Sequence, residues 1–326
     1  MTRAGVIVLA AIALFAAAAP ILAPNDPATP FVDRGYAPPT HVHVSDTSGW
    51  HAPFIYRQVL VDRVDRRYVE DTSTRFPIQW WRGGRLMSVD LAGGPLLLLG
   101  ADAIGRDVFS GLAYGARLSL GVTLVGAVGA LLVGAVVGAL AGLAGGFLES
   151  SLMWLADFML VLPPIYLLLV VRAKMPLSLD VAPVFTLMAV LFAAAGWPVV
   201  ARGVRGIVAT ERARDYTQAA RAIGAGPIRL IRHVLPAAKG FLAVELVLLV
   251  PAMLIAEATL SFLGLGFPAD RPSWGTMLQG AGNVPLLPEA PWLLAPAVML
   301  FVVVLGLQLV LGPRAERTAL TVASRS

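Results

Sequence analysis

Few residues of this chain have the type and spacing needed for catalysis or metal binding. Only four histidines occur in 326 residues, and the absence of cysteine excludes disulfides, thiolate metal sites and a cysteine nucleophile. His41 and His43 have a spacing found in metal sites, but no third ligand stands near them. The two lysines, Lys174 and Lys239, follow no glycine-rich loop, so the chain has no phosphate-binding P-loop. We therefore expect no catalytic residue, metal or cofactor in this chain, and any nucleotide chemistry belongs to a partner.

Three carboxylates lie in or near apolar segments, where a charge is costly. Asp157 and Glu245 fall toward segment ends, so water or arginine pairing accounts for them. Glu257 lies deeper in its segment. Two interpretations of Glu257 stay open: a polar group on a translocation path or gate, and a structural hydrogen bond between helices.

A basic, helix-forming stretch, YTQAARAIGAGPIRLIRHVLP at 216–236, lies between two apolar segments. Its helical spacing aligns an apolar stripe of Tyr216, Ala219, Ala220 and Ile223. Gly224 suits the left-handed position that ends a helix, and the following Gly-Pro pair suits a new helix start. Such short helices are marginal alone, so the stripe needs burial against the membrane bundle or in a groove of another protein. A basic helix lying on the anionic inner leaflet is the alternative.

The composition assigns the elements around this stretch to a membrane. The chain is 57% hydrophobic and 14% charged, with a mean hydropathy of +0.76. One soluble core cannot hide that much apolar surface, so we predict an all-α integral membrane protein in a lipid bilayer. About six runs have the length of a membrane span: 4–23, 114–143, 147–171, 181–200, 241–263 and 292–311. The first could instead be a cleavable signal peptide.

Arginine counts orient these spans. The connection 202–239 holds seven arginines and one lysine against two carboxylates, which predicts a cytoplasmic loop. The arginines near both chain ends place both termini on the same side. The sequence thus divides into a first helix at 1–23, an extracytoplasmic insert at 24–100, a five-helix core at 101–312 and a cytoplasmic tail at 313–326. Within the core, 202–239 is the cytoplasmic loop and 264–291 an outer loop.

The insert at 24–100 differs in composition from the rest of the chain. Alternating stretches at 41–44 and 54–61 predict short strands in a small mixed fold. A cap on the helix ends and a contact surface for an extracytoplasmic partner are both compatible with it. Within the second span, Gly134, Gly138 and Gly142 repeat every four residues, which predicts close helix packing.

The basic loop resembles the EAA signature of permease subunits of binding-protein-dependent ABC importers, at Gln218, Ala219, Ala220, Gly224 and a downstream Leu235-Pro236 pair. GADAIGRDVFS at 100–110 and AEATLSFLGLGFPADRPSWGTML at 256–278 resemble the peptide and nickel importers within that family. With APW at 290–292, the likeness covers about 99–312 in the right order.

The resemblance implies a type I ABC importer permease in a bacterial-type inner membrane. It implies a homologous permease partner, two cytoplasmic ATPases that hold ATP and Mg, and an extracytoplasmic binding protein; nucleic acid is not a partner. The ATPases would dock on Tyr216, Gln218, Ala219, Ala220, Ile223 and Gly224. The outer loop would touch the binding protein through Asp270, Arg271, Ser273 and Trp274. Peptides lead as substrate, with nickel and glutathione-like compounds behind them.

Two departures from the pattern lie in the loop. Gln218 replaces the usual glutamate, which weakens a charge-assisted contact to a neutral hydrogen bond. The run from Gly224 to Leu235 is one residue shorter than the family pattern, which would turn a continuous helix by about 100°.

Two other classes stay open. A secondary transporter or channel-like protein without ATPases would need intramembrane ion ligands or two similar halves, and the sequence shows few charges and no clear repeat. A membrane-embedded hydrolase would need a nucleophile with a base inside the bundle, whereas three histidines fall in the insert and one in the basic loop.

Overall fold

The computed structural model describes residues 3–323 except 48, 162–165, 167–168, 172–173, 175, 177–179, 225 and 269. The chain forms two compact units. We call residues 120–257 and 307–326 the α6 unit, and residues 3–119 and 258–306 the α10 unit. Each is described by itself.

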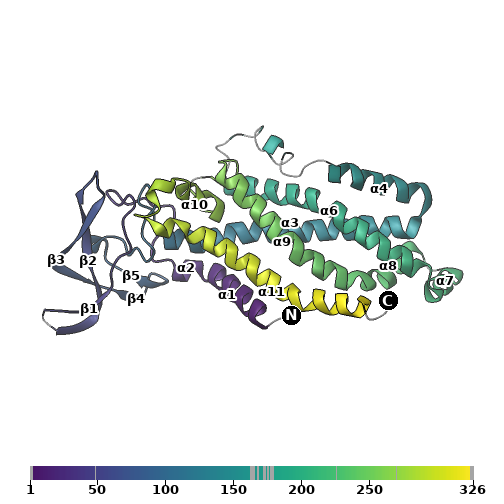
Figure 1. Cartoon of the computed structure of the whole chain (residues 1–326), viewed down its shortest axis with the longest axis horizontal. Helices are drawn as coiled ribbons and strands as arrows, with labels where there is room; N and C mark the ends of the chain where they lie inside the picture. Colours follow the sequence, from purple (N-terminus) through teal and green to yellow (C-terminus); the bar gives the residue numbers. More distant parts are fainter. Residues whose placement is uncertain are drawn as a thin grey trace. The chain divides into compact units, whose positions relative to one another are not determined.

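The helices follow the apolar segments of the sequence (Figure 1). Their bounds are α1 Arg3–Ala17, α2 Ala19–Leu22, α3 Val108–Ala144, α4 Gly146–Val161, α6 Val181–Arg212, α7 Asp215–Ala222, α8 Pro227–Val234, α9 Lys239–Phe262, α10 Trp274–Ala281 and α11 Ala295–Ala323. Short 3-10 turns lie at Leu91–Gly93, Leu235–Ala238, Val284–Leu286 and Pro291–Leu294.

Four helical segments of the described residues are long and apolar enough to cross a membrane: Val108–Ala144, Val181–Arg212, Arg229–Phe262 and Pro291–Val310. They correspond to the second, fourth, fifth and sixth predicted spans. The first predicted span appears as α1 followed by α2, interrupted at Ala18 just before Pro20. The third begins with α4, and the Pro163-Pro164 pair that we expected to bend it lies outside the described residues. The mostly helical membrane fold is confirmed.

In the α6 unit, α3 and α6 pack through the predicted glycine repeat. An added Cβ at Gly134 would lie 2.5 Å from Cβ of Val200, and one at Gly142 would lie 2.8 Å from Val208. The small residues therefore let the two helices approach within the subunit. Helix α4 is tied to α6 by ion pairs of Asp157 with Arg202 and of Glu149 with Arg205. The predicted arginine pairing of Asp157 is confirmed.

The α10 unit contains the strands of the insert (Figure 1). Strands β1 His43–Asp46, β2 Gly49–Asp62 and β3 Arg67–Pro77 form an antiparallel sheet in the order β1-β2-β3. Strands β4 Gln79–Arg82 and β5 Arg85–Ser88 form a separate antiparallel hairpin. Ile55, Ile78 and Leu96 make the core of the insert. The prediction of short strands in this segment is confirmed.

Candidate functional site

The α6 unit presents the basic loop as two short helices after α6. The chain turns from α6 into α7 around Glu211, whose carboxylate accepts a 2.6 Å hydrogen bond from the Tyr216 hydroxyl and pairs with Arg214 at 3.1 Å. The bond to Glu211 raises the pKa of Tyr216. Thr217 donates its hydroxyl to the carbonyl of Glu211 at 2.8 Å. These contacts fix the direction in which α7 leaves α6.

Helix α7 buries one side and exposes the other. Thr217 is 1% exposed, and Ala220 packs against the apolar cluster of the α6 unit. Tyr216 is 47% exposed, Ile223 is 86% exposed and Ala219 is exposed. Three of the four residues of the predicted stripe therefore face away from the chain. The bundle does not supply the burial that the stripe needs.

The buried Thr217 is the contact that the sequence argument missed. A threonine on a basic segment was taken as part of the polar face, although its three-residue spacing to Ala220 places both on one side of a helix. Because its hydroxyl is satisfied by the Glu211 carbonyl, the side chain can be buried without the cost of an unpaired polar group.

The break between α7 and α8 lies where the glycines predicted it. Gly224 has φ +82°, a left-handed conformation that favours glycine, and is exposed. Helix α8 begins at Pro227 with Gly226 as its N-cap. Leu230, Val234 and Ala238 then pack into the cluster that holds Val204 and Val208 of α6.

This break corrects the argument from loop length. A residue fewer between Gly224 and Leu235 would rotate the later half only in a continuous helix, and the helix here is interrupted between Ala222 and Pro227. The expected rotation of about 100° therefore does not apply.

Gln218 is exposed on α7, and its side-chain Nε2 donates to the carbonyl of Ala213 at 3.2 Å. Ala213 is the C-cap of α6, so the amide satisfies a carbonyl at a helix end. A carboxylate, which only accepts, could not make this contact. The glutamine that departs from the family pattern thus has a local structural role.

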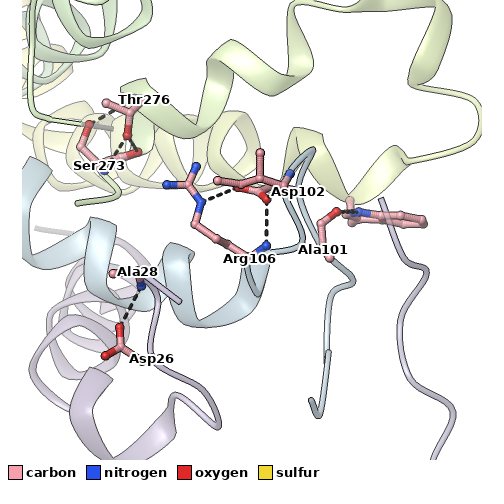
Figure 2. Close-up of polar contacts among 9 residues, drawn as sticks. Asp26, Ala28, Ala101, Asp102, Arg106, Ser273 and Thr276 are labelled. Carbon is pink, nitrogen blue, oxygen red and sulfur yellow. Dashed lines mark hydrogen bonds and ion pairs between the residues drawn. The ribbon is translucent and has the colours of Figure 1, made fainter. Parts of the chain in front are cut away.

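In the α10 unit, the stretch 100–110 forms a tight turn before α3 (Figure 2). The Asp102 carboxylate accepts from the backbone N–H of Ile104 at 3.0 Å and of Arg106 at 2.9 Å. It also accepts from Nε of Arg106 at 2.7 Å. Gly100 and Gly105 have φ +82° and +85°. Aspartate, arginine and glycines of this motif are therefore used to shape the turn.

Asp107 joins this turn to the start of α3 and to the segment after α2. Its carboxylate accepts from the backbone N–H of Phe109 at 3.1 Å, from the Ser110 hydroxyl at 2.5 Å and from Nδ2 of Asn25 at 3.0 Å. The side chain is almost fully enclosed, and burial raises the pKa of Asp107. Three donors around one buried acceptor make Asp107 a tie between two chain segments.

The outer loop is more ordered than its glycine and proline content predicted, because α10 occupies its centre. Ser273 caps α10 in a reciprocal pair with Thr276: Ser273 Oγ accepts from the Thr276 N–H at 3.2 Å, and Thr276 Oγ1 from the Ser273 N–H at 2.8 Å (Figure 2). Trp274 is 0% exposed and donates its indole N–H to the carbonyl of Leu112 at 3.0 Å. Its backbone N–H donates to Ser119 Oγ at 3.1 Å.

These contacts divide the four predicted binding-protein residues. Ser273 and Trp274 are fully enclosed by the chain, so in this structure they build the loop and present no surface to a partner. Asp270 and Arg271 are exposed and lie 3.9 Å apart as a surface ion pair. A contact with a binding protein stays a prediction for these two.

A cavity of about 330 Å³ lies between the 102–108 turn and α10. Its polar lining comes from both motifs, with Asp102, Arg106, Thr276, Gln279 and Asn283. The two stretches that resemble the peptide and nickel importers therefore meet at one hollow of the α10 unit.

Glu257, the carboxylate predicted for a path or gate, is 0% exposed, and Glu245 is 8% exposed. Both interpretations of Glu257 stay open, because a gate can be closed. Among the described residues, no group of three His, Asp or Glu side chains could hold a metal ion.

Comparison with known proteins places these elements in one family. Residues 130–315 match the family model described as "Binding-protein-dependent transport system inner membrane component". The chain is 34% identical to the oligopeptide transport system permease protein OppC of Bacillus subtilis over 65% of this chain and 67% of the relative. It is 35% identical to a putative peptide permease protein of Brucella ovis over 67% of this chain and 73% of the relative. A di/tripeptide transport system permease protein DppC of Pseudomonas aeruginosa is 33% identical over 72% of both chains.

Proposed function

This chain belongs to the family of binding-protein-dependent transport system inner membrane components, and from that premise we propose that it works as one half of an ATP-driven importer. In this proposal it pairs with a homologous permease to enclose a translocation path. A binding protein delivers the solute from outside, and two ATPase subunits drive the path between its two openings. The chain itself is a transport permease and not an enzyme.

Peptides are the proposed substrate class. The support is the names of the relatives, which include oligopeptide, dipeptide and di/tripeptide permeases. The cavity between the 102–108 turn and α10 gives no narrower assignment, because its lining is mixed in charge and polarity.

The exposed face of α7 carries the proposal that ATPases dock on the basic loop. Tyr216, Ala219 and Ile223 leave apolar surface uncovered on a helix too short to be stable by itself. The opposite side of α7 and the whole of α8 are anchored on α3 and α6 by Thr217, Ala220 and Leu230. A movement imposed on the exposed face would therefore be transmitted to the membrane helices beneath it. Gln218 and Gly224 lie at the edge of the same face.

The topology belongs to the proposal as well. The basic loop and both termini lie in the cytoplasm, and the insert and α10 lie outside, where Asp270 and Arg271 can meet the binding protein. Glu257 is proposed to line the path once the partner permease is present.

The docking proposal is tested by placing bulk on the α7 face. An added Cβ at Gly224 meets nothing within 4 Å, so the space for a side chain exists and only the left-handed backbone resists it. That strain costs about 1–2 kcal/mol. We expect Gly224→Trp to insert in the membrane normally but to lose uptake, while ATP hydrolysis no longer responds to substrate.

The control is Gly240→Trp, which adds the same bulk at another exposed glycine with nothing within 4 Å, at the start of α9 and away from α7. It should keep most of its uptake. Normal, coupled uptake by Gly224→Trp in the assembled transporter would count decisively against docking at this face.

A further inference from the structure

The β4–β5 hairpin, residues 79–88, holds two adjacent tryptophans in the open. Trp80 is 54% exposed and Trp81 is 70% exposed, and Arg82 beside them is exposed as well. Tryptophan carries a large apolar ring with one polar N–H, so two exposed neighbours in a folded segment mark a surface that meets something other than water.

The backbone keeps these rings outward. Trp81 has φ +56°, a left-handed conformation that costs a residue with a side chain about 1–2 kcal/mol. The turn that follows uses Gly83 and Gly84 at φ +63° and +77°, so that Arg82 pairs with Arg85 across the hairpin. Strain at a non-glycine residue persists only where the surrounding structure imposes it, and here it fixes an exposed tryptophan.

The hairpin is attached to the end of the first helix. Strand β5 packs against α2, as Figure 1 also shows, and Nη1 of Arg85 donates to the carbonyl of Pro24 at 2.7 Å. These contacts hold the hairpin to the residues that follow α1 and α2.

That attachment point lies at the edge of the apolar spans. The ring of Phe15 in α1 meets the ring of Phe109 edge-on with centroids 6.0 Å apart, and Phe109 is the second residue of the span that begins at Val108. Farther back along α1, Leu9 lies beside Gly306 of the Pro291–Val310 span. The end of α2 is therefore level with the start of α3, where hydrocarbon gives way to lipid headgroups.

The charge of the hairpin suits that layer. QWWRGGRLMS at 79–88 contains two arginines and no carboxylate. Arg82 also hydrogen-bonds the neutral Oε1 of Gln79. Arginine is suited to lipid phosphates, and tryptophan is enriched at both membrane–water boundaries because its ring is apolar and its N–H is wet.

We propose that the β4–β5 hairpin is an interfacial anchor that sets its Trp80 and Trp81 rings into the headgroup layer and its Arg82 against lipid phosphates. The anchor fixes the height of the insert above the bilayer at the point where the first helix leaves it. The insert is thus held to the membrane by lipid as well as by its own chain.

Trp50 provides a matched control within the same unit. It is 84% exposed, but it lies next to the β1–β2 turn, in a sheet edge whose neighbours include the acidic Asp46. Because the chain has no cysteine, Trp81→Cys and Trp50→Cys each accept a single bimane label. Both full-length variants are placed in nanodiscs of phosphatidylethanolamine and phosphatidylglycerol, without any binding protein.

The label at 81 should emit at shorter wavelength, be quenched by lipids carrying a nitroxide near the headgroup, and be several-fold less quenched by aqueous iodide than the label at 50. Equal iodide quenching at the two positions would overturn the proposal. Shielding of position 81 that develops only after binding protein or partner permease is added would also overturn it, and would assign the surface to that protein.

A second variant separates anchoring by the rings from effects of the label. Trp80→Phe in the labelled Trp81→Cys chain keeps an aromatic ring and should retain the lipid quenching. Trp80→Ser should reduce that quenching several-fold. Identical lipid quenching in the phenylalanine and serine variants would contradict a role for the rings.

Discussion

The α7 helix and the α10 helix both carry family-like motif residues, and they use them in opposite ways. On α7 the motif residues Ala219 and Gly224 are exposed, and Tyr216 and Ile223 beside them are exposed too. On α10 the motif residues Ser273 and Trp274 are completely buried and hydrogen-bonded within the chain. Motif membership alone therefore does not tell a docking residue from a scaffold residue.

The difference lies in what each side chain can satisfy internally. The Trp274 indole finds the Leu112 carbonyl and the Ser273 hydroxyl finds a helix N–H, so both are stable without a partner. Ile223 and Ala219 find no apolar cover in their own chain. A motif residue that the chain itself has not covered is the better candidate for a contact between subunits.

The largest effect that would sharpen this comparison is expected from Trp274→Ala. Removal of a fully buried aromatic side chain costs about 3–5 kcal/mol, so the thermal unfolding midpoint in detergent should fall strongly. Arg271→Ala, three residues away and exposed, should change stability by no more than about 0.5 kcal/mol. If both variants unfold at the wild-type midpoint, Trp274 is not a scaffold residue.

A middle-sized effect is expected from Asp107→Asn. The amide keeps the size of the side chain but turns an acceptor into a donor opposite Asn25 and Ser110, which costs about 1–3 kcal/mol. Asp26→Asn, on an exposed carboxylate nearby, serves as control.

The wild type should also show a characteristic pH dependence. Because burial raises the pKa of Asp107 above its ordinary 3.8, the folded chain keeps this proton to higher pH than the unfolded chain does. Its stabilising contribution is thus full below the ordinary value and declines as pH rises through the folded pKa. The gap between wild type and Asp107→Asn should be widest at acid pH, and a gap that widens toward neutral pH would refute the assignment.

The smallest effect is expected from Gln218→Glu. The variant loses the donation to the Ala213 carbonyl on an exposed surface, so unfolding should shift by about 0.5 kcal/mol or less. Uptake measured beside ATP hydrolysis tells whether the restored carboxylate tightens coupling. A large loss of stability would mean that Gln218 belongs to the scaffold and not to the exposed face.

Local backbone rules made parts of this structure predictable. Gly224 and the Gly226-Pro227 pair foretold the end of α7 and the start of α8, because φ above zero and a missing N–H are properties of single residues. The glycine repeat of α3 foretold its close contact with α6 for a similar reason.

Burial was harder to predict, because it depends on residues distant in the sequence. Trp274 is enclosed by Leu112 and Ser119, more than 150 positions away, and the spacing of the outer loop carries no trace of that contact. Thr217 likewise owes its burial to the carbonyl of Glu211 across a turn. The strained Trp81, whose environment is set by the pairing of β4 with β5, gave no signal beyond its aromatic neighbour.

The docking role of the α7 face is tested most directly by the reactivity of single cysteines in this cysteine-free chain. Ala219→Cys on the exposed face should react quickly with a maleimide in the permease alone and several-fold more slowly once ATPase subunits are assembled on it. Ala220→Cys, on the packed side, should react slowly in both states, and Val64→Cys in the insert quickly in both. An unchanged rate at Ala219→Cys after assembly, with the controls as expected, would contradict docking at this face.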